Sequence, residues 1–481
     1  AGPAVILAYL TAGALAVPAL FSKSELATAM PKAGGDYFFI ERSLGGAFGT
    51  MGGMAAWLSL TFKTAFALLG MGLFTRLLFP DIEPAVVKAV AIGLCVVFMV
   101  INLVGARHAG RLQSVLVISL LAALAYYILR GLPNIDVQRF ENFAPGGSSS
   151  VFATAGLVFV SYGGLTKAAS IAEETRDAGR NIPLGMTLSF IVVTALYALV
   201  VFTTVGVLDA SELANASTPI STAAAAFMGT PGVVIMTLAA LIAFTTTGNA
   251  GVLSASRTPM AMSRDGLLPG FLGRINTRCG TPHYGILVTG LIMIVAIAFL
   301  DLVTLVKVAS TMKIILFLLV NLAVIMMRES RIENYRPTFR SPFYPWVQGI
   351  GIILYGLLVF KMGGVALALT AAFFGGSLLW YVAYVGIHRR RDSALIQVVR
   401  RVTDRDLQAA EPSASALEGE LREILKERDE IGDPSHPQQA QRKVDHARHE
   451  RERHDGVEHA STVGDHRSDR RGGQHRDRPG G

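Results

Sequence analysis

Residues 156–183 read GLVFVSYGGLTKAASIAEETRDAGRNIP. An apolar run here is interrupted by the segment Ser161–Gly164, which contains two adjacent glycines, and glycine costs about 1 kcal/mol relative to alanine inside a helix. In lipid, the N–H and C=O groups released by a broken helix must find partners. The break therefore predicts either a polar site, where carbonyls bind a cation and amides bind an anion, or close packing of helices through small residues.

The composition of the whole chain is that of a membrane protein. Its 481 residues are 52% hydrophobic and 16% charged, with a mean hydropathy of +0.47, whereas soluble chains are about 25% charged. Apolar runs of about 20 residues recur, enough to cross about 30 Å of hydrocarbon. These values exclude a soluble enzyme and predict an all-α polytopic membrane protein. We expect eleven spans, at residues 3–29, 46–79, 85–104, 112–130, 148–170, 184–208, 231–255, 283–300, 302–327, 345–361 and 365–387.

The charge is unevenly divided along the chain. Residues 389–481 contain as many acidic as basic residues, so the net charge of +8 belongs to residues 1–388. Fifteen basic residues, Lys23 among them, fall in one alternate set of loops and five in the other. Basic loops typically face the cytoplasm, which predicts a cytoplasmic C-terminus in the plasma membrane. No aromatic-interleaved basic patch indicates a nucleic-acid partner.

The topology has a consequence at the start of the chain. Eleven spans with a cytoplasmic C-terminus place residue 1 outside, and the chain opens on Ala1-Gly2-Pro3 at the edge of an apolar run. No basic region precedes that run, so it does not read as a signal peptide. We therefore expect that the chain lacks its beginning, including one further span.

The composition changes after residue 388, the end of the predicted membrane domain. Residues 389–431 form a linker region in which residues 416–431, ALEGELREILKERDEI, carry apolar residues at helical spacing. An amphipathic helix or a solvated one fits this pattern. Residues 432–481 have few apolar residues and seven of the ten histidines at irregular spacing. We expect a disordered tail and no metal site.

Four segments, taken in order, resemble the amino acid–polyamine–organocation permease superfamily. The most informative is Phe159–Pro183, with Ala172-Glu173-Glu174-Thr175 and Arg180-Asn181-Ile182-Pro183 after the break. The others are Glu25-Leu26 with Pro31–Tyr37, Asn102–Gly105 with Gly110–Gln113, and Ser256-Arg257 with Ala261–Pro269. The resemblance covers about residues 1–388.

The resemblance implies a leucine-transporter-type fold. Two five-helix repeats run in opposite orientation and two extra helices follow, so the eleven spans correspond to helices two to twelve of the family. The absent first helix carries, in the family, a glycine-rich break whose amides hold the substrate carboxylate. The implied function is secondary active transport of amino acids or related amines by alternating access.

The resemblance also assigns roles to residues near the break. Backbone carbonyls of Ser161, Tyr162, Gly163 and Gly164, with the tyrosine ring, would face the substrate ammonium and side chain. Glu173 and Glu174 would lie at the cytoplasmic end of that helix among the gating contacts. Salt bridges of these carboxylates with Arg176 or Arg180 are the alternative interpretation.

The sequence departs from the family at one position, so the identity of the ion that drives transport is not determined by the resemblance. Many proton-coupled relatives carry a lysine in helix five, and here that position falls at Ser119 or Leu120. Proton symport is our preferred prediction, and the Ser119 hydroxyl offers a sodium site as the alternative. Two lysines within apolar spans, Lys63 and Lys313, are candidates for a proton carrier or a counter-charge, or are structural lysines that reach carbonyls or the interface.

The remaining predictions concern a polar cluster, the tail and the competing functions. Thr246 and Asn249 either line the cavity or hold an ion, or they make helix–helix hydrogen bonds. Residues up to about Ile431 resemble the link to a universal-stress-type domain that some such permeases carry, but the residues beyond lack strand patterns. The alternatives are a transporter-like amino acid sensor, which needs a folded output domain, and a channel, which needs a continuous polar pore. We expect no enzymatic activity and no cofactor.

Overall fold

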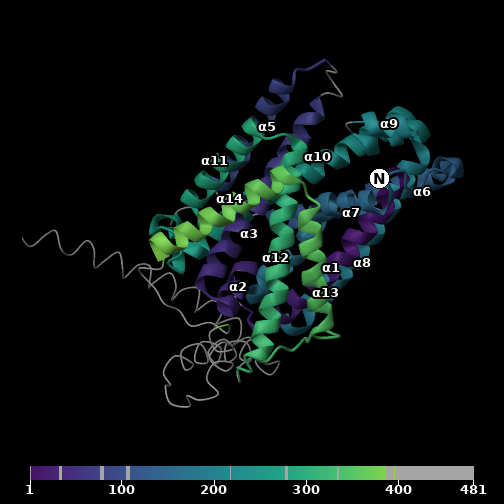
Figure 1. Ribbon diagram of the computed structural model, residues 1–481. Helices are drawn as coiled ribbons and strands as arrows, with labels where there is room; N and C mark the ends of the chain where they lie inside the picture. The colour runs from purple at the N-terminus through teal and green to yellow at the C-terminus, as the bar shows by residue number, and fades with distance from the viewer. Residues whose placement is uncertain are drawn as a thin grey trace, which may run out of the picture. The chain divides into compact units, whose positions relative to one another are not determined.

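The computed structural model of the protein describes residues 2–31, 35–75, 81–104, 109–216, 218–276, 280–332, 335–385 and 395. Within these ranges the elements are helices, joined by turns and loops (Figure 1). The predicted amphipathic helix at residues 416–431 and the tail at 432–481 lie outside the described residues.

The first half of the chain forms long apolar helices. A 3₁₀ turn, Gly2–Ala4, leads into α1, Val5–Ala29. The short helix α2, Asp36–Leu44, turns directly at Gly45 into α3, Gly46–Leu73. Two further helices follow, α5, Pro84–Val104, and α6, Ala109–Gly131. Short 3₁₀ turns at Leu132–Asn134 and Val137–Phe140 lead to α7, Gly147–Val158, which continues as the 3₁₀ helix η4, Phe159–Glu174.

The second half begins with α8, Ala178–Val207, and the one-and-a-half-turn helix α9, Ala210–Asn215. Helix α10, Pro219–Arg264, is two helices joined at Gly229, whose φ of 63° only glycine adopts readily. A 3₁₀ turn, Gly270–Gly273, precedes α11, His283–Phe299, and α12, Leu302–Glu329. The last helices are α13, Trp346–Phe360, and α14, Gly364–Trp380, which ends in a π turn at Tyr381–Val385.

The predicted all-α polytopic membrane fold is confirmed. Among the described residues, eight helices are long and apolar enough to cross a membrane, and α11 and α13 are shorter apolar helices. The predicted apolar segments coincide with helices, with one informative exception. The segment expected at residues 148–170 is divided between α7 and η4, since the α-helix ends at Val158.

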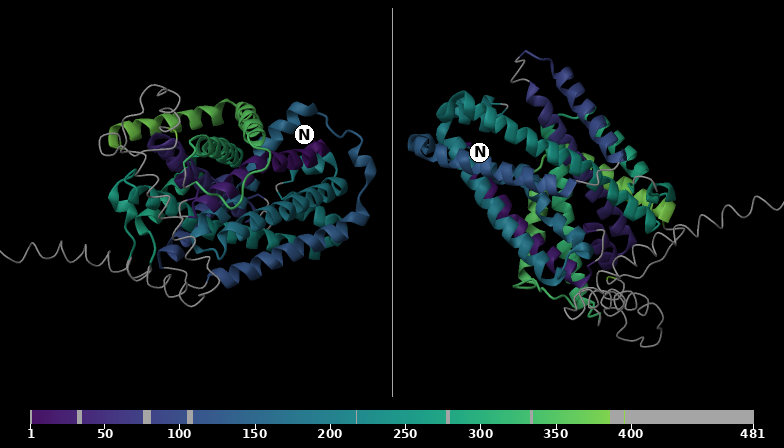
Figure 2. Two further views of the ribbon diagram at one scale, coloured as in Figure 1. Left: turned by 90° about the horizontal axis from the view of Figure 1, so that it is seen from below. Right: turned by 180° about the vertical axis from the view of Figure 1, so that it is seen from behind.

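Helix α12 is the centre of the bundle. It packs against α1, α2, α3 and α13 (Figure 1). Most of its residues between Leu305 and Met327 are buried. Seen along the bundle in Figure 2, α14 lies on one side and α6 on the opposite side. One apolar cluster joins η4 to α1, α12 and α13 through Tyr162, Phe317 and Tyr355. The interrupted segment is therefore held inside the helix bundle.

Candidate functional site

The break predicted from the two glycines lies where the α-helical hydrogen bonding ends. Helix α7 stops at Val158, and Ser161–Gly164 belongs to η4, a 3₁₀ helix of 16 residues. Runs of 3₁₀ helix longer than three or four residues are uncommon and often mark a functional hinge. The change of helix type alters which carbonyls receive intrahelical hydrogen bonds.

Carbonyl oxygens at the break accept hydrogen bonds from side chains of three neighbouring helices. Ser310 Oγ of α12 donates to the Leu157 carbonyl at 3.1 Å. Lys63 Nζ of α3 donates to the Val160 carbonyl at 3.2 Å. Tyr197 of α8 donates its hydroxyl to the Ser161 carbonyl at 3.4 Å. The broken helix is thus stabilised within an apolar bundle by polar side chains, one of which is an ammonium group.

Tyr162 is a packing residue in this structure. Its ring is fully buried and lies edge-on to Tyr197, with the ring centroids 5.4 Å apart. Its hydroxyl donates to the Tyr9 carbonyl of α1 at 3.0 Å. Gly13 of α1 permits this approach, because a Cβ there would lie 2.9 Å from the tyrosine oxygen. The ring therefore fixes the distance between α1, α8 and the break.

The two predicted lysines flank the two glycines. A Cβ placed on Gly163 would lie 3.4 Å from Lys313 Cε, and one on Gly164 would lie 3.9 Å from Lys63 Nζ. Lys63 and Lys313 come from α3 and α12, which pack against each other. The sequence marks both lysines and both glycines as unusual within apolar runs, and the structure brings these four residues together.

Lys313 belongs to a charged cluster that sequence analysis missed in part. Its Nζ lies 3.2 Å from Asp36 Oδ2, and the other carboxylate oxygen of Asp36 pairs with Lys23 Nζ. Both ammonium groups also lie over the Phe317 ring, at 4.6 Å for Lys23 and 5.0 Å for Lys313. We call Lys23, Asp36 and Lys313 the lysine–aspartate cluster.

Lys23 corrects one detail of the charge analysis. The loop-charge pattern assigns Lys23 to the basic residues of the loops, but its side chain is 0% exposed within α1. The signal available in the sequence was a lysine inside an apolar run, followed by an aspartate after Gly34-Gly35. Burial raises the pKa of Asp36, which precedes the apolar span α3, but the two ammonium groups outweigh burial and lower that pKa to about 2.

The other predicted site residues are placed elsewhere. Ser119 is exposed on α6, which packs against α8 and α10. Thr246 donates its hydroxyl to the Ala243 carbonyl within α10 at 2.9 Å. Asn249 Oδ1 accepts from Asn102 Nδ2 at 2.9 Å, which joins α10 to α5. The Asn249–Asn102 bond joins two helices, whereas the Thr246 bond stays within α10. The side chains of Glu173 and Glu174 lie outside the described residues.

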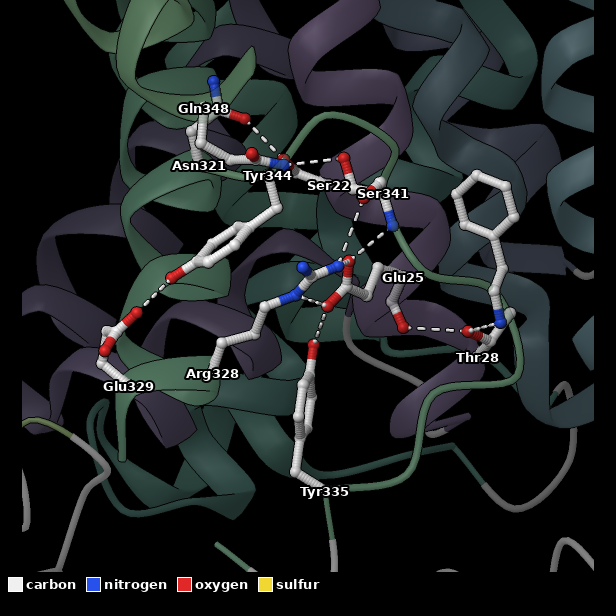
Figure 3. Close-up of polar contacts among 11 residues, drawn as sticks. Ser22, Glu25, Thr28, Asn321, Arg328, Glu329, Tyr335, Ser341, Tyr344 and Gln348 are labelled. Atoms are coloured by element: carbon white, nitrogen blue, oxygen red, sulfur yellow. Dashed lines mark hydrogen bonds and ion pairs between the residues drawn. The ribbon is translucent and has the colours of Figure 1, made fainter. Parts of the chain in front are cut away.

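A second polar cluster surrounds Glu25, near the Ala29 end of α1 (Figure 3). The Glu25 carboxylate is 0% exposed and accepts hydrogen bonds from Nε and Nη2 of Arg328, at 2.7 and 2.6 Å. The Tyr335 hydroxyl and the Ser341 backbone N–H also donate to it, at 2.9 and 2.8 Å. One carboxylate therefore ties α1 to α12 and to the loop before α13. We call these four residues the Glu25 cluster.

Neighbouring contacts extend the Glu25 cluster to α13. Ser22 Oγ donates to Asn321 Oδ1 at 2.6 Å, and Gln348 Nε2 donates to Ser341 Oγ at 2.7 Å (Figure 3). Burial and the Glu25 carboxylate raise the pKa of Tyr335, in the loop, well above its ordinary value of 10.0. Tyr335 therefore remains a hydrogen-bond donor over the physiological pH range. In the sequence, Glu25 is marked only as part of the Glu25-Leu26 motif.

Comparison with known proteins gives a consistent result. A family model described as amino acid permease matches residues 1–387. The branched-chain amino acid permease BcaP of Lactococcus lactis is 27% identical over 413 residues, which cover 81% of this chain and 87% of that protein. The methylthioribose transporter of Bacillus subtilis is 26% identical over 373 residues, covering 74% and 80%. The cationic amino acid transporter 1 of Arabidopsis thaliana is 27% identical over 342 residues, covering 67% and 57%.

Proposed function

The chain belongs to the amino acid permease family, and from this premise we propose that it carries amino acids or related amines across the membrane by alternating access, coupled to protons. The three relatives described above are, by their names, transporters of amino acids or of methylthioribose. Within the family a transporter makes no chemical bond in its cargo, so the site has to bind, orient and release.

The observation that carries the proposal is the charged surroundings of the break. Lys63 donates to the Val160 carbonyl in the first turn of η4, and Lys313 lies against Gly163, deep among apolar helices. Ionisable groups within membrane helices are expensive and usually mark a substrate or ion pathway. Carbonyls at a helix end attract cations, and the Lys63 ammonium already occupies such a position at Val160.

The proposal includes an orientation. Loops rich in lysine and arginine typically face the cytoplasm, which assigns the Ala29 end of α1 and the Glu329 end of α12 to that side. The Glu25 cluster then holds these two ends together on the cytoplasmic side. In an alternating cycle the break would open first to one side of the membrane and then to the other.

The charges at the break make a prediction about cargo. With Lys63 and Lys313 beside the two glycines, a cationic amino acid side chain meets like charge, which costs binding energy in a poorly screened site. We expect unlabelled neutral and acidic amino acids to inhibit uptake of a labelled neutral one more strongly than arginine, lysine or a polyamine. An inhibition series at equal concentrations measures this order. Strongest inhibition by arginine or a polyamine would contradict the assignment.

Transport itself is tested by uptake into proteoliposomes that contain the full-length protein. A labelled amino acid mixture is offered with an inward proton gradient, with a sodium gradient, and with neither. The proposal expects accumulation that requires the proton gradient and is abolished by a protonophore. Accumulation that only a sodium gradient drives would show that sodium, and not the proton, is the coupling ion. Specific binding without flux in intact vesicles would favour a sensor.

A further inference from the structure

The connection between α10 and α11 has a surplus of positive charge that the proposed function does not use. Residues 257–283 contain four arginines and one acidic residue, Asp265. The Asp265 carboxylate accepts a hydrogen bond from the Tyr37 hydroxyl of α2 at 2.6 Å, so it is engaged with another part of the bundle. This stretch includes Ala261–Pro269, one of the segments that resemble the permease superfamily, to which the break assigns no role.

Three of these arginines are exposed and have donors to spare. The guanidinium groups of Arg257, Arg264 and Arg274 make no hydrogen bond, ion pair or ring contact within the part of the chain that the structure describes. Arg328, by contrast, binds the Glu25 carboxylate. A guanidinium offers five N–H donors in a planar fork that fits the oxygens of a phosphate group. The three side chains are therefore available to an anionic ligand.

Arg264 and Arg274 come from neighbouring positions because the chain folds back after α10. The 3₁₀ turn Gly270–Gly273 packs against the α10 helix that precedes it. Gly273, directly before Arg274, lies so near Arg264 that an added Cβ would be 3.6 Å from Arg264 Cγ. A single small anion can therefore reach both guanidinium groups.

The start of α11 lies beside the same stretch of α10. A Cβ on Gly285 would be 2.8 Å from the Ser256 carbonyl oxygen, so the residue after Tyr284 touches the residue before Arg257. The Tyr284 ring also lies edge-on to Phe271 of the 3₁₀ turn, with the ring centroids 5.7 Å apart. We call the residues gathered here the arginine patch: Arg257, Arg264, Phe271, Arg274 and Tyr284.

An exposed apolar stripe on α11 leads away from the arginine patch. Tyr284 is followed at helical spacing by Leu287, Leu291 and Val295, whose side chains are 44%, 60% and 48% exposed. Residues three and four positions apart share one face of a helix, so these side chains form a continuous stripe. In a membrane such a stripe faces the lipid tails, and tyrosine is enriched where the tails meet the headgroups. The arginine patch therefore lies at the level of the headgroups.

We propose that the arginine patch binds the headgroup of an anionic phospholipid whose acyl chains lie along the α11 stripe. The headgroup phosphate accepts hydrogen bonds from Arg264 and Arg274, and Arg257 adds to the attraction. The Phe271 and Tyr284 rings contact the lipid where its chains begin. Each arginine near an anionic lipid strengthens binding by about fivefold. The stripe selects a lipid over a soluble anion, and the inference stands independently of the proposed transport.

The test measures binding of one lipid to the purified full-length protein in detergent. Phosphatidylglycerol with a fluorescent acyl chain is titrated with protein, and the fluorescence anisotropy reports binding. Phosphatidylcholine with the same chain is the lipid without net charge. We expect the wild type to bind phosphatidylglycerol more tightly. In Arg264→Gln/Arg274→Gln the affinity for phosphatidylglycerol should fall by about 25-fold, while the affinity for phosphatidylcholine stays the same.

A matched variant removes equal charge elsewhere. Arg130 and Lys361 are exposed basic residues at the ends of α6 and α13, away from the arginine patch. Arg130→Gln/Lys361→Gln should bind both lipids as the wild type does. All four substitutions alter exposed side chains, so each double variant is expected to stay monodisperse in detergent.

Several results would overturn the inference. One is equal affinity of the wild type for the two lipids, and another is wild-type affinity for phosphatidylglycerol in Arg264→Gln/Arg274→Gln. Displacement of phosphatidylglycerol by excess inorganic phosphate would identify a site for a soluble anion instead. A measurement on the unaltered protein does not depend on any variant: added salt should weaken the binding of phosphatidylglycerol and not that of phosphatidylcholine, because ions screen the exposed charges. Binding of phosphatidylglycerol that salt leaves unchanged would also contradict the inference.

Discussion

Replacing Glu25 by alanine lowers the free energy of unfolding by about 3–5 kcal/mol, the usual cost of removing one partner from a buried ion pair. The loss is large because four donors converge on this carboxylate: two nitrogens of Arg328, the Tyr335 hydroxyl and the Ser341 N–H. The variant removes the acceptor that these four donors share, and of the four only Arg328 Nη2 keeps a second one among the described residues, the Ser341 carbonyl at 3.3 Å. The measurement is the fraction of purified protein that stays monodisperse in detergent after heating through a temperature series.

A matched control and a double variant define the source of that loss. Glu329 lies on the same helix as Arg328, and its exposed carboxylate accepts a hydrogen bond from the Tyr344 hydroxyl at 2.7 Å. Glu329→Gln should change the free energy of unfolding by no more than about 0.5 kcal/mol. Glu25→Met combined with Arg328→Met should recover part of the loss, because no unpaired guanidinium remains. Equal stability of Glu25→Ala and the wild type would show that the Glu25 cluster does not hold α1 to α12.

Replacing Gly163 by leucine abolishes most of the transport activity without unfolding the protein. A Cβ at this position meets Lys313 Cε at 3.4 Å, an ordinary contact, so Gly163→Ala fits the available space. The further carbons of leucine have to displace the lysine chain, and overpacking costs about 1–3 kcal/mol. If substrate binding bears that cost, the affinity for substrate falls by roughly fivefold to 150-fold.

The comparison that tests this prediction uses three glycine variants at equal protein content. Initial rates of amino acid counterflow should rank wild type and Gly163→Ala close together, with Gly163→Leu far below. Gly356→Leu, on α13 where nothing lies within 4 Å of an added Cβ, should transport normally. Normal transport by Gly163→Leu would show that the substrate does not pass this glycine.

Much of the fold follows from composition and local pattern. The apolar run predicted at residues 3–29 became α1, Val5–Ala29, and the run at 302–327 became α12, Leu302–Glu329, because a span of this length in lipid has to be helical. The glycine pair indicated the break correctly, since its cost in a helix is a local property. The C-terminal predictions at residues 389–431 and 432–481 lie, apart from residue 395, outside the described residues.

The partners of the break were harder to predict because they come from distant parts of the chain. Asp36 and Lys313 are 277 positions apart, and Glu25 and Arg328 are 303 apart. Hydropathy marks Lys63 and Lys313 as unusual without indicating which carbonyl or carboxylate each one contacts. The sequence pattern allows Asn249 to line the cavity or to bond to another helix. Its bond to Asn102 follows from the packing of α10 on α5, which the pattern does not contain.

Counterflow tests the central claim, that the polar break carries an amino acid across the membrane, most directly. Proteoliposomes with the full-length protein are loaded with unlabelled amino acids and diluted into a trace of labelled ones, with no ion gradient. We predict that label rises transiently above the level in protein-free liposomes, and that Gly163→Leu prevents the rise while Gly163→Ala allows it. No rise with folded, correctly oriented wild-type protein would contradict the claim.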